Sequence, residues 1–364
     1  MSPTAIYIHT PFCPSKCGYC DFNSYAMTGE IIDRTVTAME AEIRASPWRG
    51  VPAKTIFFGG GTPTFLPTAG LLRLLEAVVA VHPPVPGCEI TSEANPGTVD
   101  AEKFGAMRGA GFNRLSLGAQ SFFEDDLVRL GRVHRVGEIE RAVDLAREAG
   151  FDNVNLDLMF ALPGQSIDAW GHNLNRAILL EPDHLSLYCL TLEPNTPFYV
   201  QNLRGQLVQP DEDLQVAMFD LASEVATSAG YEHYEISNFA RPERQSQHNL
   251  CYWRSESYAG YGPGAVGFME GVRYTNLKQP VRYCDAVESS ATLAFESEEV
   301  NDKAREVERI MLGIRLSEGI SPEGIEMSSI ESLVGRGWLE MNGRLRLTPA
   351  GRHFCTEVAL ELID

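Results

Sequence analysis

Three cysteines near the start of the chain, Cys13, Cys17 and Cys20, have the spacing CxxxCxxC and follow the apolar run at 5–9. Three thiolates on one short loop can each bind one iron of a cubane [4Fe–4S] cluster, which leaves the fourth iron without a protein ligand. A structural zinc site is the alternative, but zinc in such sites takes four ligands. His9 is the nearest candidate for a fourth, and the sequence has no second CxxC pair. The ligand count therefore favours the cluster.

Further polar and glycine residues stand where strand-like runs end. The glycines of the segment 59–62 follow one such run, and consecutive glycines let backbone N–H groups converge on an anion. Acidic or amide side chains end three other runs, and a nearby arginine could pair with a carboxylate. These residues are Glu93, Gln120, Asp157 and Arg132. Because functional residues of barrel enzymes lie at the carboxyl ends of the strands, we expect them to face the cysteine loop.

The elements that would position these residues alternate regularly over the first 230 residues. The strand-like runs are 5–9, 54–60, 89–94, 113–120, 153–160 and 184–190. The main helix-like segments between and after them are 31–45, 69–82, 101–111, 137–150, 167–180 and 211–230. Six alternations predict a parallel sheet with right-handed crossovers, and six is too few to close an eight-stranded barrel. We therefore predict an α/β fold, a partial (β/α)6 barrel over residues 1–230.

After residue 230 the pattern changes. Residues 231–268 mix aromatic residues, histidine and glycine without a helical period, and we interpret residues 231–298 as a connecting segment. Residues 299–364 predict a helix at 302–316, a helix at 325–336, a hairpin turned by Asn342–Gly343 and a last helix near Pro349. This order indicates a winged-helix-like domain. The helix at 325–336 contains one cation, so we do not expect it to read DNA.

Composition narrows the possible partners and the location. The chain has 364 residues and a net charge of −19, with 49 acidic and 30 basic residues, which argues against nonspecific binding of nucleic acid. No apolar run is long enough to span a bilayer, and no signal peptide is evident. We therefore expect a cytoplasmic protein without a transmembrane segment. The other five cysteines stand singly, as is typical of small buried apolar side chains.

The cysteine motif resembles that of radical S-adenosylmethionine enzymes, in which S-adenosylmethionine chelates the open iron. Nearly the whole chain resembles the oxygen-independent coproporphyrinogen III oxidases and their relatives, through segments at 7–25, 57–66, 113–122, 130–134 and 155–166. The resemblance implies an electron donor for the cluster and one or two bound S-adenosylmethionine molecules. It implies these contacts to S-adenosylmethionine: Tyr7, Gly60, Gly61, Thr62, Glu93, Gln120, Arg132 and Asp157, with looser matches at Thr191 and Val266.

Two features depart from the oxidases of that family. Phe22 stands where the oxidases have a further cysteine, and only twelve residues precede Cys13, where the oxidases have a longer segment. A third feature, the sequence HNLCYW at 248–253, matches the HNxxYW motif of heme-binding chaperones in the same family. The match implies heme binding by His248, Asn249, Tyr252 and Trp253.

The chemistry of this motif suits heme, although other interpretations remain open. An imidazole can be an axial ligand of iron, and Tyr252 and Trp253 offer large flat faces to a macrocycle. His233 and Cys251 are competing ligands. The simpler alternative is a packed aromatic loop in which His248 is hydrogen-bonded in place.

Three hypotheses follow for the function. The first is a heme chaperone that binds heme and transfers it to acceptor hemoproteins, by resemblance respiratory ones, without being an active coproporphyrinogen III oxidase. The second is that oxidase, which decarboxylates two propionates of coproporphyrinogen III to give protoporphyrinogen IX in porphyrin biosynthesis. The third is a zinc-stabilised barrel without a redox role.

Overall fold

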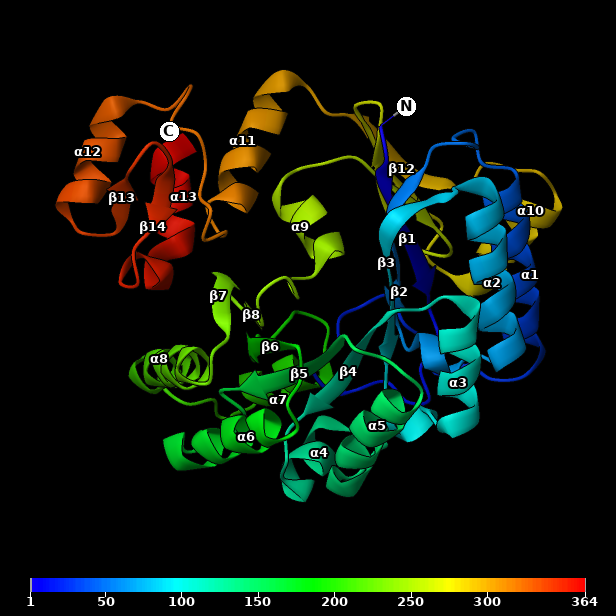
Figure 1. Ribbon diagram of the computed structural model, residues 1–364, viewed down its shortest axis with the longest axis horizontal. Helices are drawn as coiled ribbons and strands as arrows, with labels where there is room; N and C mark the ends of the chain where they lie inside the picture. The colour runs from blue at the N-terminus through cyan, green and yellow to red at the C-terminus, as the bar shows by residue number, and fades with distance from the viewer. Residues whose placement is uncertain (1, 364) are drawn as a thin grey trace.

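Six parallel strands form the frame of the protein, and a computed structural model describes residues 2–363. Each strand pairs with the next one in the sequence. They are β1 (Thr4–Thr10), β2 (Ala53–Gly60), β3 (Pro84–Ala94), β4 (Arg114–Gln120), β5 (Val154–Phe160) and β6 (His184–Cys189). The predicted partial (β/α)6 barrel is therefore confirmed (Figure 1).

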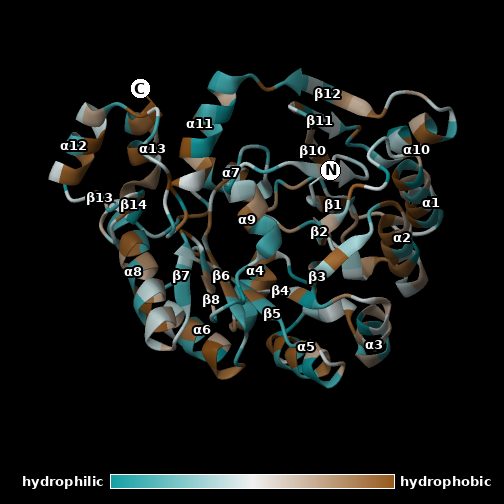
Figure 2. Cartoon of the chain, turned by 45° about the horizontal axis from the view of Figure 1, so that its top comes forward, coloured by the Kyte–Doolittle hydropathy of each residue, from teal (hydrophilic) through white to brown (hydrophobic). Residues whose placement is uncertain are grey.

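Helices cover the outer face of this curved sheet, as Figures 1 and 2 show. They are α1 (Glu30–Arg44), α2 (Thr68–Val81), α3 (Ala101–Ala110), α5 (Val136–Glu148), α6 (Ile167–Leu179) and α8 (Glu212–Ser228). Two short helices, α4 (Glu124–Leu130) and α7 (Pro197–Leu203), instead lie beside the cysteine loop, where Leu130 and Phe198 form backbone hydrogen bonds with Gly18. Helix α1 illustrates the pattern, because Ile32, Val36, Met39 and Ile43 recur at helical spacing and are buried against the sheet. Side chains of Asp100, Ser166 and Asp211 cap the amino ends of α3, α6 and α8.

The sheet continues beyond the six strands at both edges. Strand β9 (Tyr258–Tyr261) runs parallel to β1, followed by antiparallel β10 (Val266–Met269), β11 (Val272–Asn276) and β12 (Ala294–Glu299). At the other edge lie β8 (Asn238–Ala240) and β7 (Glu232–Glu235). Within residues 2–363 the open sheet has twelve strands, from β12 to β7.

Apart from Glu299 at the end of β12, these added strands come from residues 231–298, which the sequence led us to describe as a connecting segment. Strands of three to six residues without clear alternation gave no periodic signal there. The same stretch contains α9 (Gln247–Trp253) and α10 (Pro280–Glu288). The division of the chain into parts at 230 and 298 stays a prediction.

The last part of the chain has its own apolar core, built from α11 (Asp302–Gly313), α12 (Met327–Gly335), the hairpin β13 (Leu339–Met341) and β14 (Leu345–Leu347), and α13 (Cys355–Ile363). The predicted order of helix, helix, hairpin and helix is confirmed, and Gly343 in the hairpin turn has a φ of 72°. Arg315 joins this part to the barrel through an ion pair of 2.7 Å with Glu235, whose side chain is fully buried.

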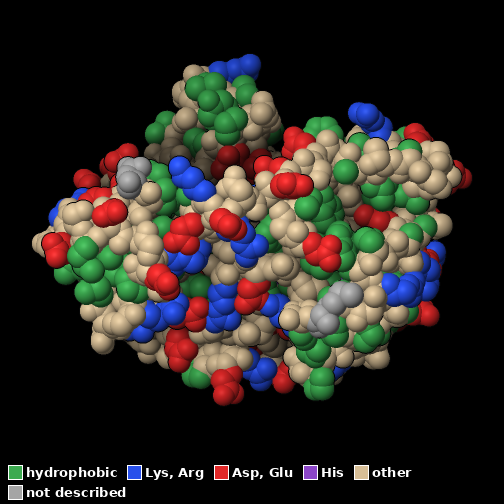
Figure 3. All heavy atoms as spheres, turned by 90° about the horizontal axis from the view of Figure 1, so that it is seen from above, with side chains coloured by type: hydrophobic (Ala, Val, Ile, Leu, Met, Phe, Trp, Pro, Cys, Tyr) green, Lys and Arg blue, Asp and Glu red, His purple; other side chains and the backbone are tan. Residues whose placement is uncertain are grey.

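Two further observations concern the surface. No helix within residues 2–363 combines the length and apolar character needed to cross a bilayer. On the face of these residues shown in Figure 3, acidic and basic side chains are interspersed, with no broad basic patch.

A carboxylate ties the added strands to the first helix. Glu42 on α1 accepts hydrogen bonds from the Gly262 backbone N–H (2.7 Å), the Asn276 side-chain amide (2.6 Å) and the Tyr283 hydroxyl (2.5 Å). Burial raises the pKa of Glu42. One side chain therefore connects α1 with the segment after β9, with β11 and with α10.

We expect Glu42→Ala to lower the free energy of unfolding by about 3 kcal/mol, because three buried donors lose their acceptor. Urea unfolding followed by circular dichroism measures this change. Glu40→Ala is the matched control on the same helix, since Glu40 forms only exposed ion pairs with Arg44 and Arg73, which contribute about 1 kcal/mol or less. Equal losses in the two variants would contradict the role assigned to Glu42.

Candidate functional site

A central cavity of about 540 Å³ lies inside the barrel. The three cysteines line it together with the residues expected to contact S-adenosylmethionine and with three residues of the HNxxYW motif. The lining includes Tyr7, Cys13, Cys17, Cys20, Gly60, Gly61, Thr62, Glu93, Gln120, Arg132, Asp157, His248, Asn249 and Tyr252. Of the two looser matches, Thr191 is exposed outside this lining, and Val266 lines a second, adjoining cavity.

The cysteine loop is held at the carboxyl ends of the strands by backbone hydrogen bonds. The N–H of Cys13 donates to the carbonyl of Tyr25 (3.1 Å), and that of Gly18 donates to the carbonyl of Leu130 (3.2 Å). All three cysteines are half-buried and form no disulfide. Burial raises the pKa of the Cys13 and Cys20 thiols.

Within residues 2–363, no three His, Cys, Asp or Glu side chains converge on a point as one metal ion requires. A cubane cluster has a different requirement, because each cysteine binds a separate iron. Three thiols on one loop that face a common cavity fit this requirement. Two donors lie beside them: the Thr62 hydroxyl is 3.5 Å from Cys13 Sγ, and Arg132 Nη1 is 3.8 Å from Cys17 Sγ. Hydrogen bonds to the sulfurs are a means by which proteins tune such clusters.

The glycine segment at the carboxyl end of β2 has no room for side chains. A Cβ on Gly61 would lie 2.6 Å from the carbonyl oxygen of Phe12, and one on Gly60 would collide with the His9 ring. Gly60 also has a φ of 103°, which a residue with a Cβ rarely adopts. Its N–H donates to Glu93 Oε2 (3.1 Å). The backbone therefore passes directly beside the cysteine loop and the acidic wall of the cavity.

The charges in the cavity suit a zwitterion. Burial, followed by repulsion from Asp157, raises the pKa of Glu93 to about 8. Burial also raises the pKa of Asp157, which accepts hydrogen bonds from Asn155 Nδ2 (2.7 Å) and Ser116 Oγ (3.1 Å). The Arg132 guanidinium lies at the same wall and donates to the Gly118 carbonyl (2.7 Å). The cavity thus offers carboxylates to an ammonium or sulfonium group and a guanidinium to a carboxylate.

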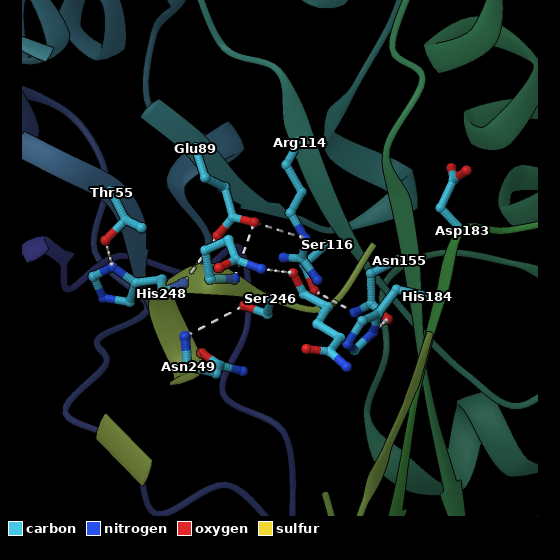
Figure 4. Close-up of polar contacts among 12 residues, drawn as sticks. Thr55, Glu89, Arg114, Ser116, Asn155, Asp183, His184, Ser246, His248 and Asn249 are labelled. Atoms are coloured by element: carbon cyan, nitrogen blue, oxygen red, sulfur yellow. Dashed lines mark hydrogen bonds and ion pairs between the residues drawn. The ribbon is translucent and has the colours of Figure 1, made fainter. Parts of the chain in front are cut away.

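The motif helix α9 closes the opposite end of the barrel from the cysteines. Glu89 on β3 accepts hydrogen bonds from the backbone N–H groups of Gln247 (3.1 Å) and His248 (3.0 Å), and Arg114 Nε lies 3.9 Å from Glu89 (Figure 4). Thr55 pairs with Glu89 across β2 and β3, and Arg114 begins β4. The helix is therefore anchored near the amino ends of the strands, and the central cavity separates it from the cysteine loop.

His248 is fully buried, and both nitrogens of its ring have partners. Nδ1 is 2.8 Å from the Thr55 hydroxyl, and Nε2 is 2.8 Å from the Tyr252 hydroxyl (Figure 4 shows the first contact). The ring stacks on Phe57 with centroids 4.9 Å apart. Burial lowers its pKa to about 3, with Arg114 and Lys54 contributing, so the imidazole is neutral.

The two aromatic residues of the motif point in different directions. Tyr252 faces the cavity and meets the ring of Tyr258 edge-on, with centroids 4.7 Å apart. Trp253 lies outside the lining and packs on the cluster of Tyr234, Ala240, Leu250 and Leu316, with the Arg315 guanidinium 4.7 Å from its ring centroid. Its contact with heme stays a prediction.

The competing ligands also lie outside the cavity lining. The ring of His233 stacks on Phe239 at 4.0 Å, and its Nε2 is 3.0 Å from the carbonyl of Ile236. The Cys251 thiol is buried and lies 3.1 Å from the carbonyl of Gln247. Both side chains are engaged in local packing.

Sequence reasoning missed several polar residues that line the cavity. They are Arg114 and Ser116 on β4, Asn155 on β5, and Ser186 and Tyr188 on β6. A signal was present, because Arg114 and Ser116 precede Gln120 at even spacing and Asn155 lies two residues before Asp157. Residues two apart on a strand face the same side, so the inward face could have been traced from the predicted site residues.

Comparisons with known proteins identify the family of this chain. Residues 7–177 match the Radical SAM superfamily. A protein of Bacillus subtilis (strain 168) named heme chaperone HemW is 39% identical over 318 residues, covering 86% of this chain and 84% of the relative. Its namesake in Escherichia coli (strain K12) is 43% identical over 290 residues, covering 77% and 75%.

A solved structure agrees as well. The coproporphyrinogen III oxidase HemN of Escherichia coli, a radical SAM enzyme, superposes with a TM-score of 0.86 at 21% identity, covering 99% of this chain and 90% of that one, which shows the fold. The family model and the fold therefore place the chain in the radical SAM superfamily. Within it, the chain belongs to the HemW family.

The raised pKa of Glu93 predicts a pH dependence of stability in the protein without ligands. A carboxyl that titrates near 8 when folded and near 4.5 when unfolded retains its proton only in the fold. The stability of the parent should therefore fall between about pH 5 and pH 8, relative to Glu93→Gln, by roughly 3 to 4 kcal/mol.

Urea unfolding at several pH values in this range tests the expectation. Glu102→Gln, at an exposed position on α3, is the control and should follow the parent. A difference between the parent and Glu93→Gln that does not change with pH would show that Glu93 ionises normally.

Proposed function

We propose that this protein binds heme and transfers it to acceptor hemoproteins, and that it carries a [4Fe–4S] cluster and S-adenosylmethionine. One observation carries the proposal: His248, Asn249 and Tyr252 of the HNxxYW helix line the same cavity as the three cysteines. The relatives named heme chaperone HemW support it. By family resemblance, we propose respiratory hemoproteins as acceptors, an electron donor for the cluster and a cytoplasmic location.

Different residues of the central cavity would bind the two cofactors. Cys13, Cys17 and Cys20 would hold the cluster, which with S-adenosylmethionine supplies one-electron chemistry when bound. Glu93 and Asp157 would accept hydrogen bonds from a cationic group, and Arg132 would pair with a carboxylate. The glycines at 60 and 61 let the backbone pass close to His9 and Phe12, so that it lines the cavity beside such a ligand.

His248 can serve heme in one of two ways. Its neutral ring is the form that binds a metal, and ligation of iron requires Nε2 to exchange its hydrogen bond with the Tyr252 hydroxyl. If that bond is kept, His248 instead fixes the orientation of Tyr252, which faces the cavity. In both cases α9 is the element that meets the heme.

A second candidate function is oxygen-independent coproporphyrinogen III oxidase. The observation that favours it is the overlap of almost the whole fold with HemN. Phe22, which is 64% exposed at the edge of the cavity, stands where the oxidases have a further cysteine. Because of this departure, we rank the oxidase function second.

We expect anaerobic reconstitution to give an oxygen-sensitive [4Fe–4S] cluster on the three cysteines. Cys13→Ala, Cys17→Ala and Cys20→Ala should each remove most of the iron and sulfide, because each thiolate binds a separate iron. Cys88→Ala is the control, since Cys88 is buried away from the cavity lining. Near-stoichiometric zinc without cluster absorbance would favour the zinc-stabilised barrel instead.

Titration with hemin tests the motif. We expect His248→Ala to bind hemin more weakly than the parent while the cluster content stays the same. A changed Soret band in this variant identifies His248 as an iron ligand, and an unchanged band identifies a positioning role through Tyr252. Trp253→Ala should weaken hemin binding without changing the Soret band. The expected loss is about 1 to 3 kcal/mol, because that is the value of burying a large apolar side chain.

If the parent and both variants bind hemin equally and give identical spectra, the HNxxYW motif serves only to pack the helix. The same reconstituted preparation decides between the two candidates. Loss of bound heme to apomyoglobin, a convenient acceptor, supports the chaperone, whereas conversion of coproporphyrinogen III to protoporphyrinogen IX supports the oxidase.

A further inference from the structure

A second cavity, of about 690 Å³, adjoins the central one. It lies between the strands β1, β9, β10 and β11 and the helix α11 of the last part of the chain. Five residues line both cavities and form the wall between them: Tyr7, Phe22, Gly60, Glu93 and Tyr252. Tyr252 is thus the residue of the HNxxYW motif that faces both spaces.

The two cavities differ in chemistry. The central cavity holds the cysteines and several charged side chains, whereas aromatic and aliphatic side chains dominate much of the second, including Tyr258, Val266, Phe268, Met311 and Leu312. Its additional carboxylates are already paired, Glu256 with Lys54 and Glu308 with Arg273. Their charges are therefore largely neutralised within the protein.

Two cations flank Phe268 in this cavity. The guanidinium carbon of Arg273 lies 5.6 Å from the Phe268 ring centroid, and that of Arg305 lies 5.2 Å from it. Arg273 is engaged by Glu298 and Glu308, but Arg305, which is exposed on α11, forms no ion pair within residues 2–363. An apolar space with a free guanidinium at its edge fits a flat apolar molecule that carries carboxylates.

We propose that the macrocycle of heme lies in this second cavity, against Tyr252, Tyr258, Phe268 and Met311, with a propionate at Arg305. The inference rests on the proposed function and adds the place of the ligand. A volume of several hundred Å³ lined by apolar and aromatic side chains is the usual setting for a cofactor of this size. Tyr252 connects the site to the motif, since its hydroxyl is 2.8 Å from His248 Nε2.

This placement makes S-adenosylmethionine and heme neighbours rather than competitors for one space. The residues expected to contact S-adenosylmethionine at the shared wall are Tyr7, Gly60 and Glu93, and the cysteines remain on the side of the central cavity. Val266, a looser match to the S-adenosylmethionine contacts, belongs to the second cavity.

Metal-free protoporphyrin IX and hemin, titrated separately and followed by fluorescence and absorbance, test the proposal. Met311→Glu puts a carboxylate against the macrocycle and should weaken the binding of both ligands at least tenfold. Met311 is 43% exposed, so the change should not disturb the fold. Met327→Glu is the matched control, because Met327 is 51% exposed on α12 and lies outside both cavities.

Arg305→Gln is the second variant. This change should weaken the binding of protoporphyrin IX several-fold. It should leave the affinity for protoporphyrin IX dimethyl ester unchanged, because only the free acid carries charged propionates. Equal losses for acid and ester would overturn the assignment of Arg305.

The outcomes separate this proposal from the proposed function. A parent protein that binds no hemin contradicts the function itself. Hemin binding that is weakened by His248→Ala but not by Met311→Glu overturns the second cavity as the site and leaves the function standing. Equal weakening by Met311→Glu and Met327→Glu also overturns it, since the effect would then not depend on the cavity.

Discussion

The structure depends on a buried carboxylate in the barrel, Glu89, and on what that charge requires. A buried carboxylate is costly unless it is paired and hydrogen-bonded. Glu89 meets this requirement with two backbone N–H groups at the start of α9 and with Arg114 at 3.9 Å. Because these partners come from a helix far along the chain, satisfying the charge also fixes the HNxxYW helix against the barrel.

The same requirement orders the rest of the cavity. Arg114 influences several buried groups at once, since it helps to lower the pKa values of His184 and His248. In the same cavity, Glu93 and Asp157 repel each other and accept hydrogen bonds from neutral donors. The Gly60 N–H donates to Glu93, and the side chains of Ser116 and Asn155 donate to Asp157. A ligand that brings positive charge would relieve this repulsion, which is the chemistry expected of S-adenosylmethionine.

Much of the fold could be predicted because it is repetitive. Helix α1 buries Ile32, Val36 and Met39 at helical spacing, and such amphipathic signals gave the six strand–helix units and the order of elements in the last part of the chain. The strands β7 to β12 could not be predicted, because short strands at a sheet edge are fixed by their partners rather than by periodicity. The pairing of β9 with β1 joins residues about 250 positions apart, and no local pattern records it.

For the site, the sequence by itself determined the cysteine loop, the glycine segment and the acidic strand ends, because a motif fixes residue types at short spacing. It also determined that HNLCYW departs from the surrounding patterns. Tertiary structure alone decided that His248 and Tyr252 face the cysteine cavity while Trp253 turns toward Arg315. It also decided that a second cavity opens beyond Tyr252. The physical reason is that these arrangements depend on long-range partners, above all Thr55 and Glu89, which hold α9 from strands about 160 to 190 residues earlier in the chain.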